Sequence, residues 1–474
     1  MKKLIVFNVF LLLGCQQSLK SLIRIGDTEY VSVKNTGAKG DGRNDDRAAI
    51  QNALNTGGNV YFPEGDYLLE SKTDVTAMLR VSDEKYPAKI LFHKRARLVV
   101  SPRQPTDYIK PAVLGISTHT GSTIKSIEID GINIEGNRDK HKIENPGVVA
   151  FERPGSVIKR FILRNAVAKN MGGGGFHTQA RYNEFFNIYT EHCGSHGIGI
   201  VNTENKGVES EFYLDGFTSI KDDAYSIDFS GYKYDEAPYA CRPGYEWKGS
   251  AKNIVSKGSF YGIKTAGYWD LQLSNVVIEE SSNNGFFINS DAPGKTITVR
   301  NMVIKNAKGN GMSLGGQTNF VGKNITLEGC RVGLQIYKAN TDIDSLMIDS
   351  KGRNIASVRM GEGSTILKNF TIKNASAEDE YPVWVMGKNI TLENGKFINN
   401  ASPNEMIIHE DAQNVILKNL YFENNQDKKI AKAGIMNIQK SSKTEVIDCV
   451  FKGYNGKQID DRTKKMLIKN IKTN

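Results

Sequence analysis

The feature that most constrains the fold is a short pattern that recurs at intervals of 20 to 30 residues. Each copy has a polar residue, often Asn, then an apolar-x-apolar triplet, polar or Gly residues, and a second short apolar strand. The copies begin at Asn275, Asn301, Asn324, Ser345, Asn369, Asn389 and Asn419. This period, with alternation inside each unit, predicts a β-solenoid, because one coil buries its apolar face only when other coils stack on it. Neighbouring coils should form parallel strands about 4.8 Å apart.

The residues ahead of the repeats follow another pattern. Asn44, Asp45 and Asp46 precede the apolar-periodic run 47–54, and Asn or Asp in this place is an N-cap signal for a short helix. A solenoid needs its open end covered, so we expect this helix to be the cap. Asp41, Asp45 and Asp46 are then cap and turn residues rather than catalysts.

Two segments of this region resemble a known family. Residues 37–53 read G-A-x-G-D-G-x-x-D-D-x-x-A-I-Q-x-A, and residues 60–67 read V-Y-F-P-x-G-x-Y. They are similar to the N-terminal signature of the pectin-lyase-like β-helix superfamily, close to the part shared by glycoside hydrolase family 28 and pectate-lyase-type proteins. The resemblance implies an all-β, single-stranded right-handed parallel β-helix over residues 30–474. Because this superfamily holds hydrolases, lyases, epimerases and phage tailspikes, it implies no single reaction.

Residues 1–14 are typical of an export signal. Lys2 and Lys3 precede an apolar run that is too short for a stable membrane anchor. The run ends in L-L-G-C, which resembles the bacterial lipobox and implies that Cys15 is lipidated and becomes the first mature residue. We therefore expect an outer-membrane lipoprotein, facing the periplasm or the cell surface, with residues 15–29 as a linker. The alternative is an ordinary signal peptide that contains a Cys.

Charge and cysteine spacing bear on the partners. The formal net charge of +10 is spread along the chain, and a basic surface favours polyanions. No nucleic-acid recognition motif accompanies the charge, so we expect an acidic polysaccharide or oligosaccharide as partner, bound by a monomer. Cys193, Cys241, Cys330 and Cys449 are far apart without a C-x-x-C spacing, which argues against a zinc site or a disulfide framework.

The second strands of the coils can be aligned on a small leading residue. These leading residues are Gly175, Gly197, Ala224, Gly262, Gly285, Gly311 and Gly333. The second and fourth columns are nearly all apolar and should face the core, which places Tyr225 in the core. The third and fifth columns should face outward, and they hold His177, Gln179, Ser226, Asp228, Lys264, Asn289, Gln335 and Tyr337.

This alignment predicts one polar face across about four coils. The candidate catalytic residues are His196, Asp222, Asp223, Tyr261 and Lys264. The candidate substrate-binding residues are His177, Arg181, Asp228, Arg242, Trp247 and Tyr268. The insertion at residues 232–248 is rich in aromatic and cationic side chains, and it either forms a sugar-stacking wall or packs its own aromatics.

One segment resembles the catalytic coil of the polygalacturonase family. Residues 220–227 read I-K-D-D-A-Y-S-I, similar to D-D-x-x-x-I, in which carboxyl groups protonate the leaving oxygen and activate water. By this resemblance Asp222 and Asp223 would be catalytic. The N-x-D expected one coil earlier is G-S-H at 194–196, G-H-G one coil later is F-Y-G at 260–262, and the Arg of R-I-K is missing. These departures weigh against inverting hydrolysis.

The remaining His, Lys, Tyr and Asp suit β-elimination at a uronic acid. Removal of H5 needs a neutralised carboxylate, a base, and a donor for the group that leaves C4. We assign Lys264 to the carboxylate and His196 or Tyr261 as base and acid, while Asp222 and Asp223 orient them or hold Ca²⁺. The first hypothesis is a polysaccharide lyase or oligosaccharide dehydratase on pectin, alginate, ulvan or another sulfated glycan. Polygalacturonase-type hydrolysis and a non-catalytic glycan-binding surface protein are the alternatives.

Overall fold

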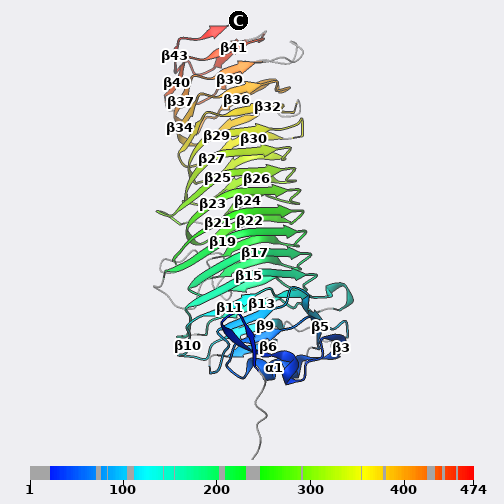
Figure 1. Cartoon of the computed structure of the whole chain (residues 1–474). Helices are drawn as coiled ribbons and strands as arrows, with labels where there is room; N and C mark the ends of the chain where they lie inside the picture. Colours follow the sequence, from blue (N-terminus) through cyan, green and yellow to red (C-terminus); the bar gives the residue numbers. More distant parts are fainter. Residues whose placement is uncertain are drawn as a thin grey trace, which may run out of the picture.

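The chain forms one long stack of β coils, with α1 (Arg47–Leu54) near one end and the C-terminus at the other (Figure 1). The computed structural model describes residues 22–473 except 71–75, 83, 104–110, 142, 154, 202–208, 231–245, 290–291, 354, 377–380, 424–432, 440–442 and 455–456. The expected export signal and Cys15 lie outside these residues. Within them, no helix is both long enough and apolar enough to cross a membrane.

A 15-stranded parallel sheet contributes one strand to nearly every coil. In order its strands are β6 (Ala77–Ser82), β9 (Ala112–Ser117), β13 (Val148–Phe151), β16 (Phe176–Thr178), β18 (His196–Val201), β20 (Tyr225–Ser230), β22 (Tyr261–Ala266), β24 (Phe286–Ile288), β26 (Asn310–Leu314), β28 (Val332–Ile336), β30 (Ala356–Met360), β33 (Val383–Val385), β36 (Asn404–Ile408), β39 (Ala433–Asn437) and β42 (Lys457–Asp461).

A 27-stranded sheet forms the rest of the coil wall. Its strands are β1 (Leu22–Ile25), β2 (Thr28–Ser32), β3 (Asp41–Asp45), β4 (Val60–Phe62), β5 (Gly65–Leu69), β7 (Lys89–Phe92), β8 (Ala96–Val100), β11 (Ile127–Asp130), β12 (Asn133–Glu135), β15 (Arg160–Lys169), β17 (Tyr182–Glu191), β19 (Ser210–Ile220), β21 (Glu246–Lys257), β23 (Tyr268–Glu279), β25 (Thr296–Lys305), β27 (Asn319–Glu328), β29 (Asn340–Asp349), β31 (Thr365–Lys368), β32 (Thr371–Lys373), β34 (Lys388–Glu393), β35 (Lys396–Ile398), β37 (Gln413–Lys418), β38 (Tyr421–Glu423), β40 (Thr444–Ile447), β41 (Val450–Lys452), β43 (Met466–Lys469) and β44 (Lys472–Thr473). A separate pair, β10 (Thr123–Ile124) with β14 (Val157–Ile158), is also parallel.

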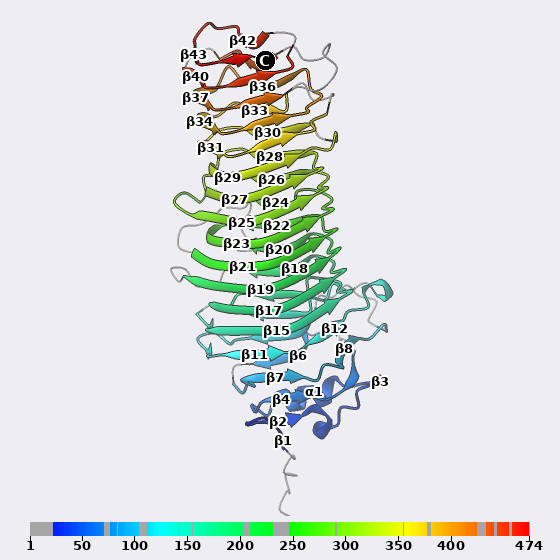
Figure 2. The ribbon, with the colours of Figure 1, turned by 45° about the horizontal axis from the view of Figure 1, so that its top comes forward.

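Strands of successive coils lie side by side along the stack (Figure 2). β15 pairs with β17, β17 with β19 and β19 with β21, all parallel and in unbroken register on each side of one bend. Only β1 with β2, at the N-terminal end, is an antiparallel pair among the described strands. The structure therefore confirms the predicted right-handed parallel β-helix.

The strands of the large sheet bend at a residue in left-handed conformation. Asn187, Asn253, Asn275, Asn301 and Asn324 lie mid-strand with φ between 53° and 58°, a region that Asn tolerates better than most residues. Their side chains form a ladder, in which Asn301 Nδ2 donates to Asn275 Oδ1 at 3.1 Å and Asn324 Nδ2 donates to Asn301 Oδ1 at 3.1 Å. The recurring Asn of the sequence is thus the bend residue of most of these coils, and Gly216 of β19 and Ser345 of β29 take the same place in theirs.

One residue of the predicted repeat, Asn389, does not align with the bend residues of the neighbouring coils. Asn389 lies in β34, and the next residue, Ile390, pairs with Thr365 ahead of the bend. The bend residue of this coil is Asn394 (φ 57°), which donates to Asn369 and accepts from Asn419, each 25 residues away. The repeat is therefore more regular here than the sequence alignment indicates.

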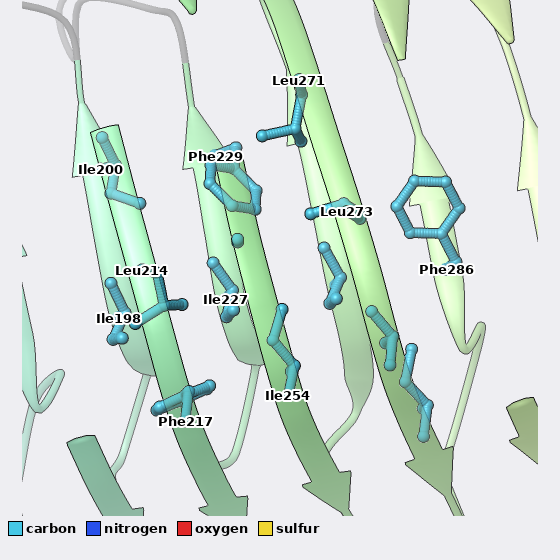
Figure 3. Close-up of a cluster of buried hydrophobic side chains, with 14 of the residues drawn as sticks. Ile198, Ile200, Leu214, Phe217, Ile227, Phe229, Ile254, Leu271, Leu273 and Phe286 are labelled. Carbon is cyan, nitrogen blue, oxygen red and sulfur yellow. The ribbon is translucent and has the colours of Figure 1, made fainter. Parts of the chain in front are cut away.

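The space between the sheets is filled by one continuous apolar core. Inward side chains such as Ile198 and Ile227 of the 15-stranded sheet face Leu214 and Ile254 of the other sheet (Figure 3). At the N-terminal end, α1 packs its buried Ile50, Ala53 and Leu54 on this core. Asp46 precedes the helix as predicted, but its carboxylate accepts from Lys39 N and Gly40 N and so fixes the preceding loop.

Candidate active site

One in-register column on the outer face of the 15-stranded sheet carries polar groups. His177 pairs with Gly199, Gly199 with Asp228, and Asp228 with Lys264. Parallel strands place these positions about 4.8 Å apart along the stack. The structure thus brings together His177, Asp228 and Lys264, which lie on three coils and span 88 positions of the sequence.

The strand β20 differs from the sequence alignment by two residues. Ile227, rather than Tyr225, pairs with the inward Ile198 and Ile263. Tyr225 instead pairs with His196 and is half-buried on the outside, so its predicted place in the core was wrong. The predicted outward place of Ser226 was also wrong, because its hydroxyl is fully buried and contacts Ser219 Oγ at 2.8 Å.

Two glycines leave the space in which the His196 side chain lies beside the column of polar groups. A Cβ on Gly199 would lie only 2.3 Å from His196 Nε2, and one on Gly174 would lie 2.8 Å from the same atom. The imidazole therefore occupies the space that two glycines leave. Its ring centroid is 5.3 Å from that of His177. We call His177, His196, Asp228 and Lys264 the polar row, one group from each of four coils.

The two imidazoles of the polar row are neutral at physiological pH. Burial and, to a smaller extent, the nearby Lys264 together lower the pKa of His196 to about 4. Burial also lowers the pKa of His177 to about 3, helped by His196 and opposed by Asp228. Ser195 Oγ lies 3.1 Å from His196 Nδ1, whereas Nε2 of both imidazoles has no hydrogen-bond partner among the described residues. A neutral imidazole with a free ring nitrogen can accept a proton.

Lys264 supplies a buried positive charge at the end of the polar row. Its Nζ lies 3.5 Å from Asp228 Oδ1 and 4.6 Å from the centre of the Tyr225 ring. Tyr225 stacks on Tyr261 at 5.2 Å, and Tyr261 accepts a hydrogen bond from Asn283 Nδ2 at 3.3 Å, which leaves its own proton available. Base, cation and phenolic donor therefore lie within one site.

Asp222 is a structural residue, and its predicted catalytic role was wrong. The residue is 1% exposed. Its carboxylate accepts from Thr190 Oγ1 at 2.7 Å, from Ser219 Oγ at 2.7 Å and from Cys193 N at 2.9 Å. These bonds hold the turn ahead of β20 to the neighbouring coil, and burial raises the pKa of the carboxyl group. The group is shielded from any ligand on the outer face.

Asp223 points the opposite way from Asp222, into a surface groove. Its carboxylate pairs with Arg138 of the η2 turn (Arg138–Lys140) at 2.7 Å. Adjacent carboxylates that point apart cannot hold one Ca²⁺ together, so this predicted calcium site was wrong. Among the described residues, no cluster of three or more His, Cys, Asp or Glu side chains could hold a metal ion.

The remaining predicted binding residues are not in the polar row. Trp247 is 1% exposed and stacks on Trp269 at 5.0 Å inside the core, so its predicted role in binding was wrong. Arg181 lies in the turn after β16, and Tyr268 begins β23; in the described part of the chain no contact joins either side chain to the row. Arg242 lies outside the described residues, as does most of the insertion at 232–248.

The sequence analysis missed three parts of this site. Gly199 makes room for His196 and appears in the sequence only as a gap in the alternation of side chains. Phe151 is 45% exposed and its ring is 5.5 Å from that of His177, which gives the polar row an aromatic edge. Arg138 reaches Asp223 across 85 positions of the sequence. Each depends on contacts between coils.

Residues 30–80 match the family described as rhamnogalacturonase A/epimerase, pectate lyase-like. The match and the coil architecture confirm the resemblance to the pectin-lyase-like superfamily. Two known proteins match over short stretches. The plasmin and fibronectin-binding protein A of Streptococcus pneumoniae is 56% identical over 46 residues, 8% of this chain and 6% of that protein. A probable glucan endo-1,3-beta-glucosidase of Arthroderma benhamiae is 40% identical over 62 residues, 12% of this chain and 7% of that protein.

The chain therefore spans less than a tenth of the length of either relative. Among solved structures, an A-module of a mannuronan C-5 epimerase from Azotobacter vinelandii is similar over 94% of this chain and 99% of that one, with 14% identity and a TM-score of 0.38.

Proposed function

We propose that this chain, which resembles the pectin-lyase-like superfamily, breaks an acidic polysaccharide or its oligosaccharides by β-elimination at a uronic acid. The match to a rhamnogalacturonase A/epimerase, pectate lyase-like family supports the coarser statement that the chain acts on or binds a carbohydrate. The observation that carries the finer proposal is the polar row, in which a neutral His196 lies beside the buried ammonium group of Lys264.

The proposed reaction uses three groups. Lys264 pairs with the uronate carboxylate, which stabilises the charge that develops when the neighbouring C5–H bond breaks. His196 Nε2 takes the proton from C5, and the electron pair of that bond forms the C4–C5 double bond. The C4–O bond breaks with its electrons on oxygen, which takes a proton from the Tyr261 hydroxyl. Asp228 orients Lys264 before substrate arrives.

Polygalacturonase-type hydrolysis is less well supported, because it needs two carboxyl groups on either side of the scissile bond. Asp222 is committed to interior hydrogen bonds, and Asp223 is paired with Arg138. Glycan binding without catalysis remains the second candidate. The observation that favours it is the exposure of two aromatic side chains, Phe151 beside His177 and Phe260 in the turn before β22, which are 45% and 42% exposed, since exposed rings stack on sugars.

An assay of the purified protein on pectin, alginate and ulvan distinguishes elimination, hydrolysis and binding without catalysis. Elimination produces ultraviolet absorbance from the unsaturated uronate together with new reducing ends, whereas hydrolysis produces reducing ends alone. We expect absorbance with wild type, none with His196→Gln, a strongly reduced rate with Lys264→Met, and the wild-type rate with His409→Gln, a histidine outside the polar row. Retention of glycan with neither signal would favour binding alone and overturn the proposal.

We also propose that Cys15 is lipidated and anchors the protein to the outer membrane. The support is the L-L-G-C sequence after a short apolar run. Full-length protein expressed in a bacterium should incorporate labelled fatty acid and fractionate with the outer membrane, and Cys15→Ser should do neither. Labelling that survives Cys15→Ser would contradict the anchor.

A further inference from the structure

A groove of about 1140 Å³ runs along the turns that precede the strands of the 15-stranded sheet. It extends from Arg138 and Asp223 past Phe260 to Arg353 and Ile355. The groove is linked to the polar row through aromatic rings. The Phe260 ring meets the Tyr261 ring edge-to-face at 4.8 Å, Tyr261 stacks on Tyr225, and Tyr225 lies beside Lys264. A ligand in the polar row can therefore continue into the groove.

The far half of the groove is lined by three exposed cations, Lys308, Arg331 and Arg353. They follow β25, β27 and β29, whose last residues are paired in register, so they lie on successive coils about 4.8 Å apart. None of the three forms an ion pair with a described residue. We call them the basic ladder. By contrast, Arg138 at the other end of the groove is neutralised by Asp223.

We propose that the basic ladder binds the acidic groups of the same glycan chain beyond the cleaved bond. The inference rests on the proposed function and deepens it, because it assigns a polymer with repeated anionic groups as the substrate. Lys308 lies in the turn before β26, two coils beyond the strand β22 that carries Lys264, or about 10 Å along the stack. Coil spacing is similar to the length of one sugar unit, so successive acidic sugars reach successive cations.

The decisive variant is Lys308→Ala with Arg331→Ala and Arg353→Ala. Loss of three exposed ion pairs with the glycan should lower kcat/KM on polymer about tenfold, chiefly by raising KM. The kcat/KM on a disaccharide of the same uronate should stay unchanged. The matched control is Lys388→Ala with Lys396→Ala and Lys469→Ala, which removes three positive charges from exposed strand residues of the 27-stranded sheet. The control should behave as wild type on both substrates.

Polymer kinetics unchanged in the ladder variant, or an equal loss on disaccharide and polymer, would overturn the inference. Failure of the proposed function is recognised separately, because wild type would then turn over neither substrate. In that case electrophoresis through gels containing alginate tests the ladder by itself. Retardation that salt weakens, and that only the ladder variant loses, supports the ladder, whereas equal retardation of all three proteins overturns it.

Discussion

At the scale of single residues, the site depends on positions that carry no side chain. Gly199 and Gly174 leave the space in which the His196 ring lies beside His177. A side chain at either position would push the imidazole out of the polar row. The glycines are therefore as necessary for the geometry of the base as the histidine is for its chemistry.

Gly199→Ala tests this packing. The added Cβ would meet Nε2 of His196 at 2.3 Å, so the ring must move, and a displacement of this size costs about 100-fold in turnover. Ser313→Ala, a small change in the same column on β26, should leave turnover unaltered. Steady-state rates on the active glycan measure both, and a Gly199→Ala enzyme with the wild-type rate would contradict the assigned place of His196.

The acid side of the pH profile tests the electrostatics of His196. Because burial and Lys264 lower its pKa from 6.5 to about 4, the base stays unprotonated well below neutrality. We expect kcat/KM of wild type to fall only as the pH approaches 4. In Lys264→Arg, which keeps the positive charge, the acid limb should stay low, whereas the residual activity of Lys264→Met should show it shifted upward. A wild-type acid limb near 6.5 would contradict the assignment.

The residue roles could be predicted from the sequence only in part. Alternation along strands correctly placed His177, Asp228 and Lys264 on the outer face. Alignment on a small residue failed at β20, since both Ala224 and Ser226 are small and only the pairing with β18 and β22 distinguishes them. The adjacent Asp222 and Asp223 look equivalent in the sequence, although the Asp222 carboxylate lies inside the coil and the Asp223 carboxylate lies in the groove.

At the scale of elements, polar contacts between coils fix the turn ahead of β20. Asp222→Ala removes an acceptor shared by Thr190, Ser219 and the Cys193 amide. Leaving such buried donors without a partner costs about 1–3 kcal/mol. Chemical denaturation should show a lower unfolding midpoint, while turnover per folded molecule stays close to wild type. Full stability with abolished turnover would restore a catalytic role for this carboxylate.

The asparagine ladder gives a second prediction for the elements. Asn301 combines a left-handed backbone (φ 56°) with hydrogen bonds to Asn275 and Asn324. Asn301→Gly loses the bonds alone, whereas Asn301→Ala also strains the backbone by about 1–2 kcal/mol. Thermal and denaturant unfolding should therefore rank wild type above the glycine variant and the glycine variant above the alanine variant. Equal stability of the two variants would contradict the role of the bend.

At the scale of the whole molecule, the fold follows from the repeat because every coil has an apolar face that it cannot bury alone. An apolar triplet after an Asn recurs in coil after coil, and stacking is the arrangement that buries every triplet. The groove and the polar row could not be predicted as fully, since they depend on which coil lies next to which turn. Arg138 with Asp223 and Phe260 with the basic ladder are brought together only by that stacking.

The most direct test of the central claim uses a uronate polymer deuterated at C5 and mass spectrometry of the products. Elimination by His196 removes the C5 hydrogen at every cleavage, so each new unsaturated end should have lost its deuterium, and His196→Gln should give no such product. Products that keep the C5 deuterium and carry an added water would contradict the account.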